Sequence, residues 1–532
     1  MKYPIGIQDF KTIRTDGYFY ADKSALMYKL IKGGQYYFLS RPRRFGKSLL
    51  VSMMEYYFKG EKDIFQGLAI EQLEQEWKTY PVLHLDLNAA KYTTPEALTA
   101  ILESQLSRWE EAYGASPSEK VLSERFKGVI QRAYEKTGQK VAILVDEYDK
   151  PLLQAFDRSA TKGDACQSKN EELKEDYRAT LKAFYGVEKS MGAYIQFAFF
   201  TGVTKFSKVS VFSDLNNLAD ISMDKRYAEI CGITEKEIHE NLDAEVESLA
   251  QANNLTKEEC YAKLKLNYDG YHFEAGTAGM YNPFSLLRTL DSQAFKDYWF
   301  ETGTPTILVE ALKRNNYNLE ELTQEEVTAD LLGSIDSIDK NPLPLIYQSG
   351  YLTVKDYDER FEIYRLGFPN KEVERGFTRF LMPYYTSLSE AKSGVFISKF
   401  VKEIESGKPD QFMQRLDTLF ADGDYQIAGN AELYFQNAVW VIFKMVGLYT
   451  EVEHHTSNGR IDMLIKTKDY IYIIEFKLDK SADEALQQIE DKQYAKPFEH
   501  DGRIIYNIGV NFSSKTRRIE GWKVLSIHSE KE

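Results

Sequence analysis

The chain has 532 residues, enough for two or three domains that each bury a core of their own. Hydrophobic residues make up 43% of it and tyrosine and phenylalanine are abundant, which excludes a largely disordered protein. The formal net charge of −14 argues against a protein that coats nucleic acid regardless of sequence, but it leaves room for a local nucleic-acid site. Three widely spaced cysteines indicate neither a disulfide framework nor a zinc site.

The sequence lacks the signals of export and of membrane insertion. Its first residues have no apolar core of a signal peptide, and no apolar run approaches the length of a membrane span. We therefore expect a cytoplasmic protein with no membrane partner. The oligomeric state stays open, a homo-oligomer included.

The first predicted helix starts at Asp22-Lys23-Ser24, with apolar residues at helical spacing from Ala25 to Ile31. Two interpretations are open. The helix either packs beside the base of a nucleotide held by the loop that follows, or only covers the edge of a sheet.

A short basic loop then joins an apolar strand, Tyr36–Ser40, to a helix that continues through Leu49–Glu55. Strand, loop and helix in this order are typical of a phosphate-binding loop, whose backbone N–H groups face the phosphates at the helix start. Lys47 is expected to reach the β- and γ-phosphate oxygens of ATP, and the Ser48 hydroxyl to ligate Mg²⁺. Arg41 stands where the usual pattern has its first glycine. The candidate ATP-binding residues of the loop are Arg43, Arg44, Phe45, Gly46, Lys47 and Ser48.

A second strand is predicted at Tyr80–Leu87, in which His84 receives no role, and helices follow at 95–113 and 118–137. The next strand, Val141–Val145, is apolar throughout, as in a parallel sheet buried on both faces, and it ends in Asp146-Glu147. The carboxyl ends of such strands open on the ligand crevice. Asp146 is expected to hold Mg²⁺ and Glu147 to deprotonate the attacking water. The plain alternative is an acidic turn after a core strand.

A polar surface loop is expected at 158–175 and a helix at 176–190, before a third buried strand, Tyr194–Phe200. A polar residue after that strand is a candidate sensor of the γ-phosphate. Thr201 is the first choice and Thr204 the second, and a threonine that only caps the strand end is the alternative.

The middle of the chain is predicted to be mostly helical. Residues 231–330 are typical of a small helical lid, with a capping box at Thr234–Glu237. Between 342 and 370, apolar runs at 345–354 and 361–366 flank an acidic turn and predict a β-hairpin of a winged-helix-like module. Such modules either touch DNA or only pack domains together.

A second group of chemically active residues follows in the last hundred residues. Two apolar runs, 461–465 and 470–476, form a predicted hairpin that turns near Lys468-Asp469, so that Asp462 lies opposite Glu475. Lys477, two residues further, shares their face. Two carboxylates and an ammonium suit metal-dependent hydrolysis of a phosphodiester, with Asp462 and Glu475 on Mg²⁺ and Lys477 serving the nucleophile. The alternative is an acid pair with a compensating lysine on a solvated face. Gln488 and Tyr494 are candidate contacts to the substrate backbone.

These motifs resemble the AAA-ATPase-like family of bacterial proteins that carry a restriction-endonuclease-like domain at the carboxyl end. The matching segments are Ile5-Gly6, Asp9-Phe10, Asp22-Lys23, Arg41–Ser48, Val145–Pro151, Tyr268–Tyr271 and Asn282–Phe284. That family usually has arginine where Arg41 stands. The carboxyl-terminal part resembles the PD-(D/E)xK nuclease superfamily through Asp462, Glu475 and Lys477. The resemblance implies ATP binding and a nuclease.

The expected fold is therefore α/β: a P-loop parallel-sheet ATPase core at 1–230, a helical lid at 231–330, a winged-helix-like and helical linker at 331–424, and a small α/β nuclease-like domain at 425–532. The first functional hypothesis is an Mg²⁺-dependent ATPase coupled to a nuclease that acts on DNA. The competing hypothesis is a nucleotide-dependent switch whose nuclease-like fold binds without cutting.

Overall fold

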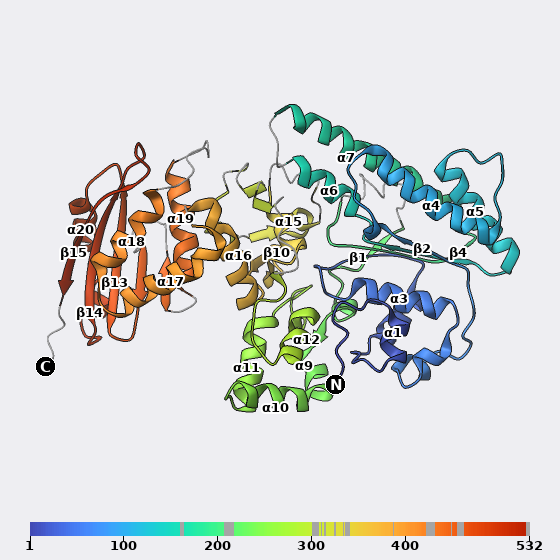
Figure 1. Ribbon diagram of the computed structural model, residues 1–532, viewed down its shortest axis with the longest axis horizontal. Helices are drawn as coiled ribbons and strands as arrows, with labels where there is room; N and C mark the ends of the chain where they lie inside the picture. The colour runs from blue at the N-terminus through green and yellow to red at the C-terminus, as the bar shows by residue number, and fades with distance from the viewer. Residues whose placement is uncertain are drawn as a thin grey trace. The chain divides into compact units, whose positions relative to one another are not determined.

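The structure is a computed structural model, and it describes residues 1–159, 164–206, 217–300, 308–309, 311–312, 315, 317–323, 326–333, 335, 341–386, 388–421, 431–447, 450–454 and 462–527 (Figure 1). The chain divides into two compact units. The first contains Met1–Ala311 and Thr323–Val373, and the second contains Leu312–Leu322 and Glu374–Glu532. Among the described helices, none is long and apolar enough to cross a membrane.

A five-stranded parallel sheet forms the centre of the first unit, in the order β2-β3-β4-β1-β5. Its strands β1 and β3 are buried along their whole length because helices cover both faces, with α1 and α3 on one side and α4, α5 and α7 on the other (Figure 1). The predicted parallel α/β core is thus confirmed. The strands are β1 (Tyr36–Ser40), β2 (Val82–Asp86), β3 (Val141–Asp146), β4 (Ile195–Gly202) and β5 (Ala219–Asp220).

The predicted helices around this sheet are present, and residues 10–15 and 150–159 are helical in addition. The segment expected as a surface loop at 158–175 is helical from Asp164 onward, because the helix carries Leu173, Tyr177, Leu181 and Phe184 at helical spacing and buries them. The helices are α1 (Phe10–Thr15), α2 (Ser24–Gly33), α3 (Lys47–Phe58), α4 (Pro95–Tyr113), α5 (Leu122–Thr137), α6 (Lys150–Ser159), α7 (Asp164–Tyr185) and α8 (Val187–Ser190), with short 3-10 turns η1 (Lys62–Phe65), η2 (Ala69–Gln72), η3 (Leu87–Ala89) and η4 (Lys225–Tyr227).

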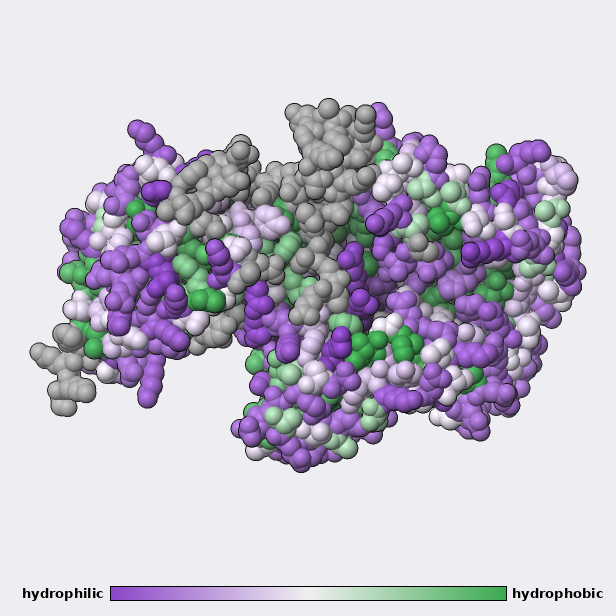
Figure 2. All heavy atoms as spheres, viewed as in Figure 1, coloured by the Kyte–Doolittle hydropathy of each residue, from purple (hydrophilic) through white to green (hydrophobic). Residues whose placement is uncertain are grey.

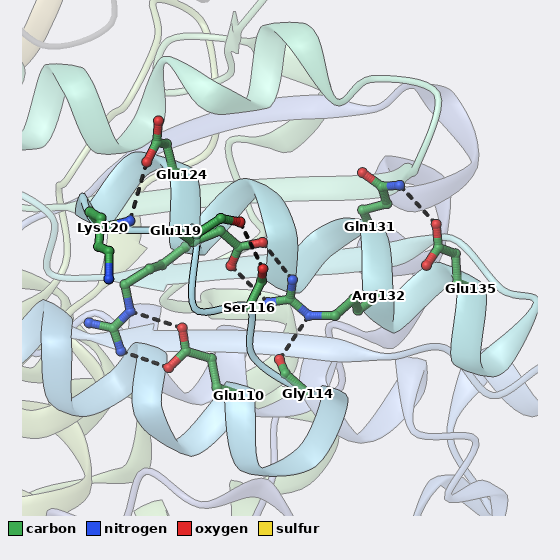
Figure 3. A network of polar contacts seen from close by, with 11 residues as sticks. Glu110, Gly114, Ser116, Glu119, Lys120, Glu124, Gln131, Arg132 and Glu135 are labelled. Carbon is green, nitrogen blue, oxygen red and sulfur yellow. Dashed lines mark hydrogen bonds and ion pairs between the residues drawn. The ribbon is translucent and has the colours of Figure 1, made fainter.

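Paired arginines join α4 to α5 (Figure 3). Arg125 donates from Nε and Nη2 to the carboxylate of Glu110, at 2.9 and 2.7 Å. Arg132 makes a second two-pronged contact with Glu119, at 2.6 and 3.0 Å, and also donates to the carbonyl of Gly114. A planar guanidinium fixes both distance and angle in such a pair, so these contacts hold the helical hairpin in one geometry.

A helical subdomain follows the sheet and packs around a core of its own, which includes Ile238, Leu249, Leu264 and Leu286. The capping box predicted at Thr234–Glu237 is present at the start of its first helix. Its elements are β6 (Ile233–Thr234), α9 (Glu235–Asn241), α10 (Asp243–Ala252), α11 (Lys257–Tyr268), β7 (Met280–Tyr281) and α12 (Pro283–Ser292).

The last part of the first unit contains a three-stranded antiparallel sheet, in the order β8-β10-β9. The predicted hairpin is present, but its first arm starts only at Thr353. Residues expected as strand from Leu345 form helix α15 instead, because Pro344 suits a first helical turn; the Asn341 side-chain oxygen, just before the helix, accepts a hydrogen bond from the Leu343 N–H at 2.9 Å. The elements are β8 (Glu326–Thr328), α14 (Ala329–Leu332), α15 (Leu343–Gln348), β9 (Thr353–Asp358) and β10 (Ile363–Gly367). The 3-10 turn η6 (Glu321–Thr323) precedes them, where the chain passes from the second unit back to the first.

The second unit is a five-stranded mixed sheet, in the order β11-β12-β13-β14-β15, between helices. Tyr472 on β13 contacts Phe412 of α18, whereas Ile471 and Ile473 on the opposite face pack against Ile489 of α20. The expected small α/β domain is thus present. Its elements are α16 (Lys371–Tyr385), α17 (Glu390–Glu405), α18 (Pro409–Ala421), α19 (Ala431–Val446), β11 (Glu451–His454), β12 (Met463–Lys466), β13 (Tyr470–Leu478), α20 (Ala482–Asp491), η7 (Lys496–Phe498), β14 (Ile504–Phe512) and β15 (Ile519–Ile527).

Candidate functional site

The predicted phosphate loop lies between β1 and α3, at the carboxyl edge of the sheet. Gly46 adopts a left-handed conformation (φ 92°) just before the helix, and nothing lies within 4 Å of the position a side chain would take. The Lys47 ammonium donates to the carbonyl oxygens of Arg41 and Pro42, at 3.0 and 3.1 Å. The Lys47 side chain therefore folds back over the loop and binds its backbone.

Arg41, in place of the usual first glycine, is buried and ties the loop to the sheet. Its guanidinium stacks 3.8 Å from the ring centroid of Phe273 and donates to the carbonyls of Ser222 and Tyr227. Burial lowers the pKa of Arg41 to about 10. Where the usual loop has a flexible glycine, this loop has a buried arginine that fixes it to the neighbouring segments.

Aromatic residues from far along the chain hold the rest of the loop. The Phe45 ring packs edge-on against Tyr271 and Phe273, with ring centroids 4.7 and 5.4 Å apart. The Trp299 indole N–H donates to the Arg43 carbonyl at 3.1 Å. Tyr268–Tyr271 entered the sequence analysis only as a segment of the family resemblance and was not connected to the loop. Its run of aromatic residues around a glycine was the available signal.

The two predicted acids sit at the end of β3, facing the loop. Ser48 lies close enough to Asp146 to act on the pKa of that carboxyl, as expected of two ligands of one metal ion. Burial raises the pKa of Asp146 to about 6, although Ser48 and the positive charge of Lys47 both act to lower it. Glu147 follows in a left-handed conformation (φ 53°), which is costly for a residue with a side chain and which clusters at functional sites.

Glu147 lies in a pocket of about 310 Å³ together with the loop. Of the charged side chains that line it in the described part of the chain, four are cationic and one, Glu147, is acidic. The cations are Arg43, Arg44, Lys47 and Lys150. Sequence reasoning missed Lys150, whose ammonium is held by the Asn88 side-chain oxygen at 2.8 Å. Its place three residues after Glu147 was the available signal.

A smaller pocket of about 80 Å³ adjoins the first and shares Pro4, Gly46, Leu49, Pro283 and Leu287 with it. The residues that line it are mostly apolar, and they come from Pro4, residues 19–23, the phosphate loop with α3, residues 230–233 and the start of α12. On the face shown in Figure 2, hydrophilic residues predominate, and apolar ones gather as a small group between α3 and α12. A charged pocket therefore continues into an apolar one.

Thr201 lies on β4, between β1 and β3, where the sequence predicted it. It is fully buried, and among the described residues its hydroxyl has no hydrogen-bond partner and it does not line the 310 Å³ pocket. Thr204, the second choice, donates from its N–H and its hydroxyl to Asp149, at 2.7 and 2.6 Å. Asp149 is thus engaged in holding the strand end.

The second site forms on β13, in the second unit. The observed pairing, Met463 with Ile474 through Lys466 with Ile471, is the predicted register. Asp462, one residue before β12, accepts a hydrogen bond from the Phe476 N–H at 2.9 Å and therefore lies beside Glu475. The Lys477 ammonium lies 2.9 Å from Oε1 of Glu475. The three residues that were expected to converge do so.

Gln488 on α20 completes this group. Its amide oxygen accepts from the Lys477 ammonium at 2.5 Å, and its amide nitrogen donates to Oε1 of Glu475. The helix reaches this position because Gly509 on β14 has no side chain: a Cβ there would meet the Ala482 carbonyl at 2.2 Å. Tyr494 is buried among apolar residues of the same layer.

The electrostatics of the second site suit a divalent cation. Glu475 is 1% exposed, and burial together with the neighbouring charge of Asp462 raises its pKa to about 7. Its Oε2 is buried without a hydrogen-bond partner in the described part of the chain. Mg²⁺ typically takes one or two carboxylates and leaves its other positions to water and substrate. No group of three or more acidic, histidine or cysteine ligands occurs among the described residues, so this pair is the set available here.

Both sites lie in segments of the chain that match known families. A family model described as "Predicted AAA-ATPase" matches residues 4–212, and one described as "PD-(D/E)XK nuclease superfamily" matches residues 430–522. A relative from Azotobacter chroococcum mcd 1, described as "Uncharacterized protein in vnfD 5'region", is 34% identical over 537 residues, which cover 99% of each chain. The chain therefore belongs to the same family as that protein, and it carries an AAA-ATPase-like domain followed by a PD-(D/E)XK nuclease superfamily domain.

Proposed function

We propose that the protein hydrolyses ATP at the loop of the first unit and cleaves DNA with Mg²⁺ at the β13 site of the second, the nucleotide state controlling access of DNA. The observation that carries the first half is the pocket that Lys47, Ser48 and Glu147 share. It combines a concentrated positive charge with one acid, in a chain whose net charge is −14. A triphosphate complements such a pocket.

The residues of the first site divide the reaction between them. The Lys47 ammonium leaves the carbonyls of Arg41 and Pro42 and reaches the β- and γ-phosphate oxygens. Ser48 and Asp146 hold Mg²⁺, which neutralises charge on the phosphates. Glu147 accepts the proton of the attacking water. Thr201 remains a proposed sensor of the γ-phosphate, although it lies behind the pocket wall: its buried hydroxyl has no hydrogen-bond partner within the described ranges.

The adjoining 80 Å³ pocket suits the adenine base. A flat, weakly hydrated ring gains most from apolar walls, which Leu49, Leu50 and Met53 of α3 and Leu287 of α12 supply. Tyr20 and Lys23, which flank the start of α2, line this pocket too. This position favours the interpretation in which the first helical segment packs beside the base.

At the second site, Asp462 and Glu475 hold Mg²⁺, which supplies a Lewis acid for the scissile phosphate. Lys477 positions the nucleophile and offsets the charge that develops on the phosphate oxygens. Gln488 keeps the lysine aligned with Glu475 and can turn its amide toward the substrate backbone. We further propose the functional division into an ATPase core (1–230), a lid (231–330), a linker (331–424) and a nuclease domain (425–532).

The test is incubation of purified protein with plasmid and linear DNA, in Mg²⁺ or Mn²⁺, with and without ATP. We expect metal-dependent cleavage that changes with ATP and disappears in Glu475→Ala. Phosphate release from ATP without cleavage of any DNA would instead support the second candidate, a nucleotide-dependent switch with a non-cleaving module. The net charge of −14 favours that candidate, because it disfavours DNA binding away from a local site.

A further inference from the structure

Two arginines of the phosphate loop point to a feature of hydrolysis that the loop motif alone does not include. Arg43 and Arg44 are exposed and line the 310 Å³ pocket with Lys47 and Glu147. Neither guanidinium forms an ion pair within the described ranges of the chain. Their charges are therefore available to a ligand in that pocket.

The loop backbone around these arginines is rigidly held. The Arg43 carbonyl accepts from Trp299, and the next residue but one, Phe45, packs between Tyr271 and Phe273. Arg44 itself is left-handed (φ 69°), a conformation that residues with side chains rarely adopt. Strain of this kind persists where the surrounding structure imposes it, and it concentrates at ligand clamps and active sites.

Phe284 fixes the direction of the Arg44 side chain. The guanidinium carbon lies 5.1 Å from the centroid of the Phe284 ring, and Phe284 lines the same pocket. The ring is held in turn by the start of α12, where the Asn282 side chain caps the Ser285 N–H at 3.1 Å. The Asn282-Pro283-Phe284 motif therefore has a role: it supports an arginine of the loop.

We propose that Arg43 and Arg44 supply in cis the positive charge that stabilises the transferring phosphoryl group, with Phe284 as the positioning residue of Arg44. Many nucleotide-hydrolysing enzymes receive this charge from an arginine of a partner, which is worth about 10³- to 10⁵-fold in rate. Here one chain carries both guanidinium groups on the loop that holds the phosphates, so a single copy of the chain suffices. This inference rests on the proposed ATP hydrolysis.

The experiment compares full-length wild type with Arg43→Ala, Arg44→Ala and the double variant. Arg360→Ala is the matched control, because Arg360 is exposed, stacks on Phe361 between β9 and β10, and does not line the 310 Å³ pocket. We expect the double variant to lose on the order of 10²-fold or more in kcat while its affinity for ADP changes by less than about threefold. Binding of ADP with aluminium fluoride, which imitates the transferring group, should fall with kcat. Phe284→Leu should lose roughly tenfold in kcat, and thermal unfolding checks that each variant is folded.

A mixing experiment tests whether the arginines act on the site of their own chain, in cis, or on the site of another copy, in trans. The double arginine variant retains Lys47 and Lys47→Ala retains both arginines, so a charge supplied in trans would restore hydrolysis when the two inactive proteins are mixed. We expect no restoration and a wild-type kcat that is independent of protein concentration. Restored activity, unchanged kcat in the double variant, or a loss confined to ADP binding would each overturn the inference. Wild type that binds ATP but releases no phosphate would refute the proposed function itself, and the inference with it.

Discussion

In the absence of metal, replacing Glu475 by glutamine should raise the free energy of unfolding of the second unit at higher pH and leave it unchanged at low pH. The rise of the Glu475 pKa from 4.5 to about 7 means that the folded protein binds a proton in this interval that the unfolded chain has lost. Stability therefore falls as pH increases from 4.5 to 7, and the loss is complete above pH 7. At about 1.4 kcal/mol per pKa unit, the full effect is roughly 3 kcal/mol.

Glutamine keeps the shape of Glu475 and cannot ionise, so the variant avoids this loss. We expect opening of β13 in Glu475→Gln to require up to about 3 kcal/mol more free energy than in wild type at pH 8, and the same free energy as in wild type at pH 4.5. Hydrogen exchange of peptides from β13 and β14, in EDTA, measures this in the full-length protein. The control is Glu490→Gln, an exposed acid on α20. Equal effects at both pH values, or destabilisation at pH 8, would refute the reasoning.

Three further predictions concern the proposed sites. Lys47→Ala should weaken binding of a labelled ATP analogue by at least about tenfold, roughly 1.4 kcal/mol; unchanged affinity in the folded variant would contradict the phosphate-loop assignment. Glu147→Gln should retain Mg-ATP binding and lose on the order of 10²-fold in phosphate release, and normal turnover would place the base elsewhere. Asp462→Ala should abolish DNA cleavage and lower the thermal stabilisation that Mg²⁺ gives wild type, whereas Lys477→Ala should lose cleavage alone; a metal response that survives Asp462→Ala would show that the ion binds elsewhere.

The experiments on Asp462, Glu475 and Lys477 require more of the chain than residues 425–532. Phe420 of α18 packs against Phe512 of β14, and the Tyr506 hydroxyl donates to the Gly407 carbonyl at 3.3 Å. Leu319 donates its N–H to the side chain of Asn437 at 2.8 Å. A fragment that starts at 425 lacks these contacts and exposes the part of the β11–β15 sheet that α18 covers. The full-length protein is therefore the material for these tests.

The sequence by itself determined the features that depend on near neighbours. An uninterrupted apolar run specifies a strand buried on both faces, so β3 and the acids at its end were predictable. A tight hairpin and the two-residue period of a strand determine which residues face each other, so the approach of Asp462 to Glu475 followed from the turn position. A short apolar run does not specify the type of element, because it suits a helix or a strand equally. Residues 345–348, which were expected to form a strand, are helical.

Only the tertiary structure decided what surrounds these residues. The cage of Tyr271 and Phe273 around Phe45, and the ring of Phe284 under Arg44, come from segments more than two hundred residues away in the chain. Gln488 reaches Lys477 only because Gly509 admits α20 to the sheet. Contacts of this kind depend on how several elements pack at once, and side chains far apart in sequence share no local pattern that could reveal it.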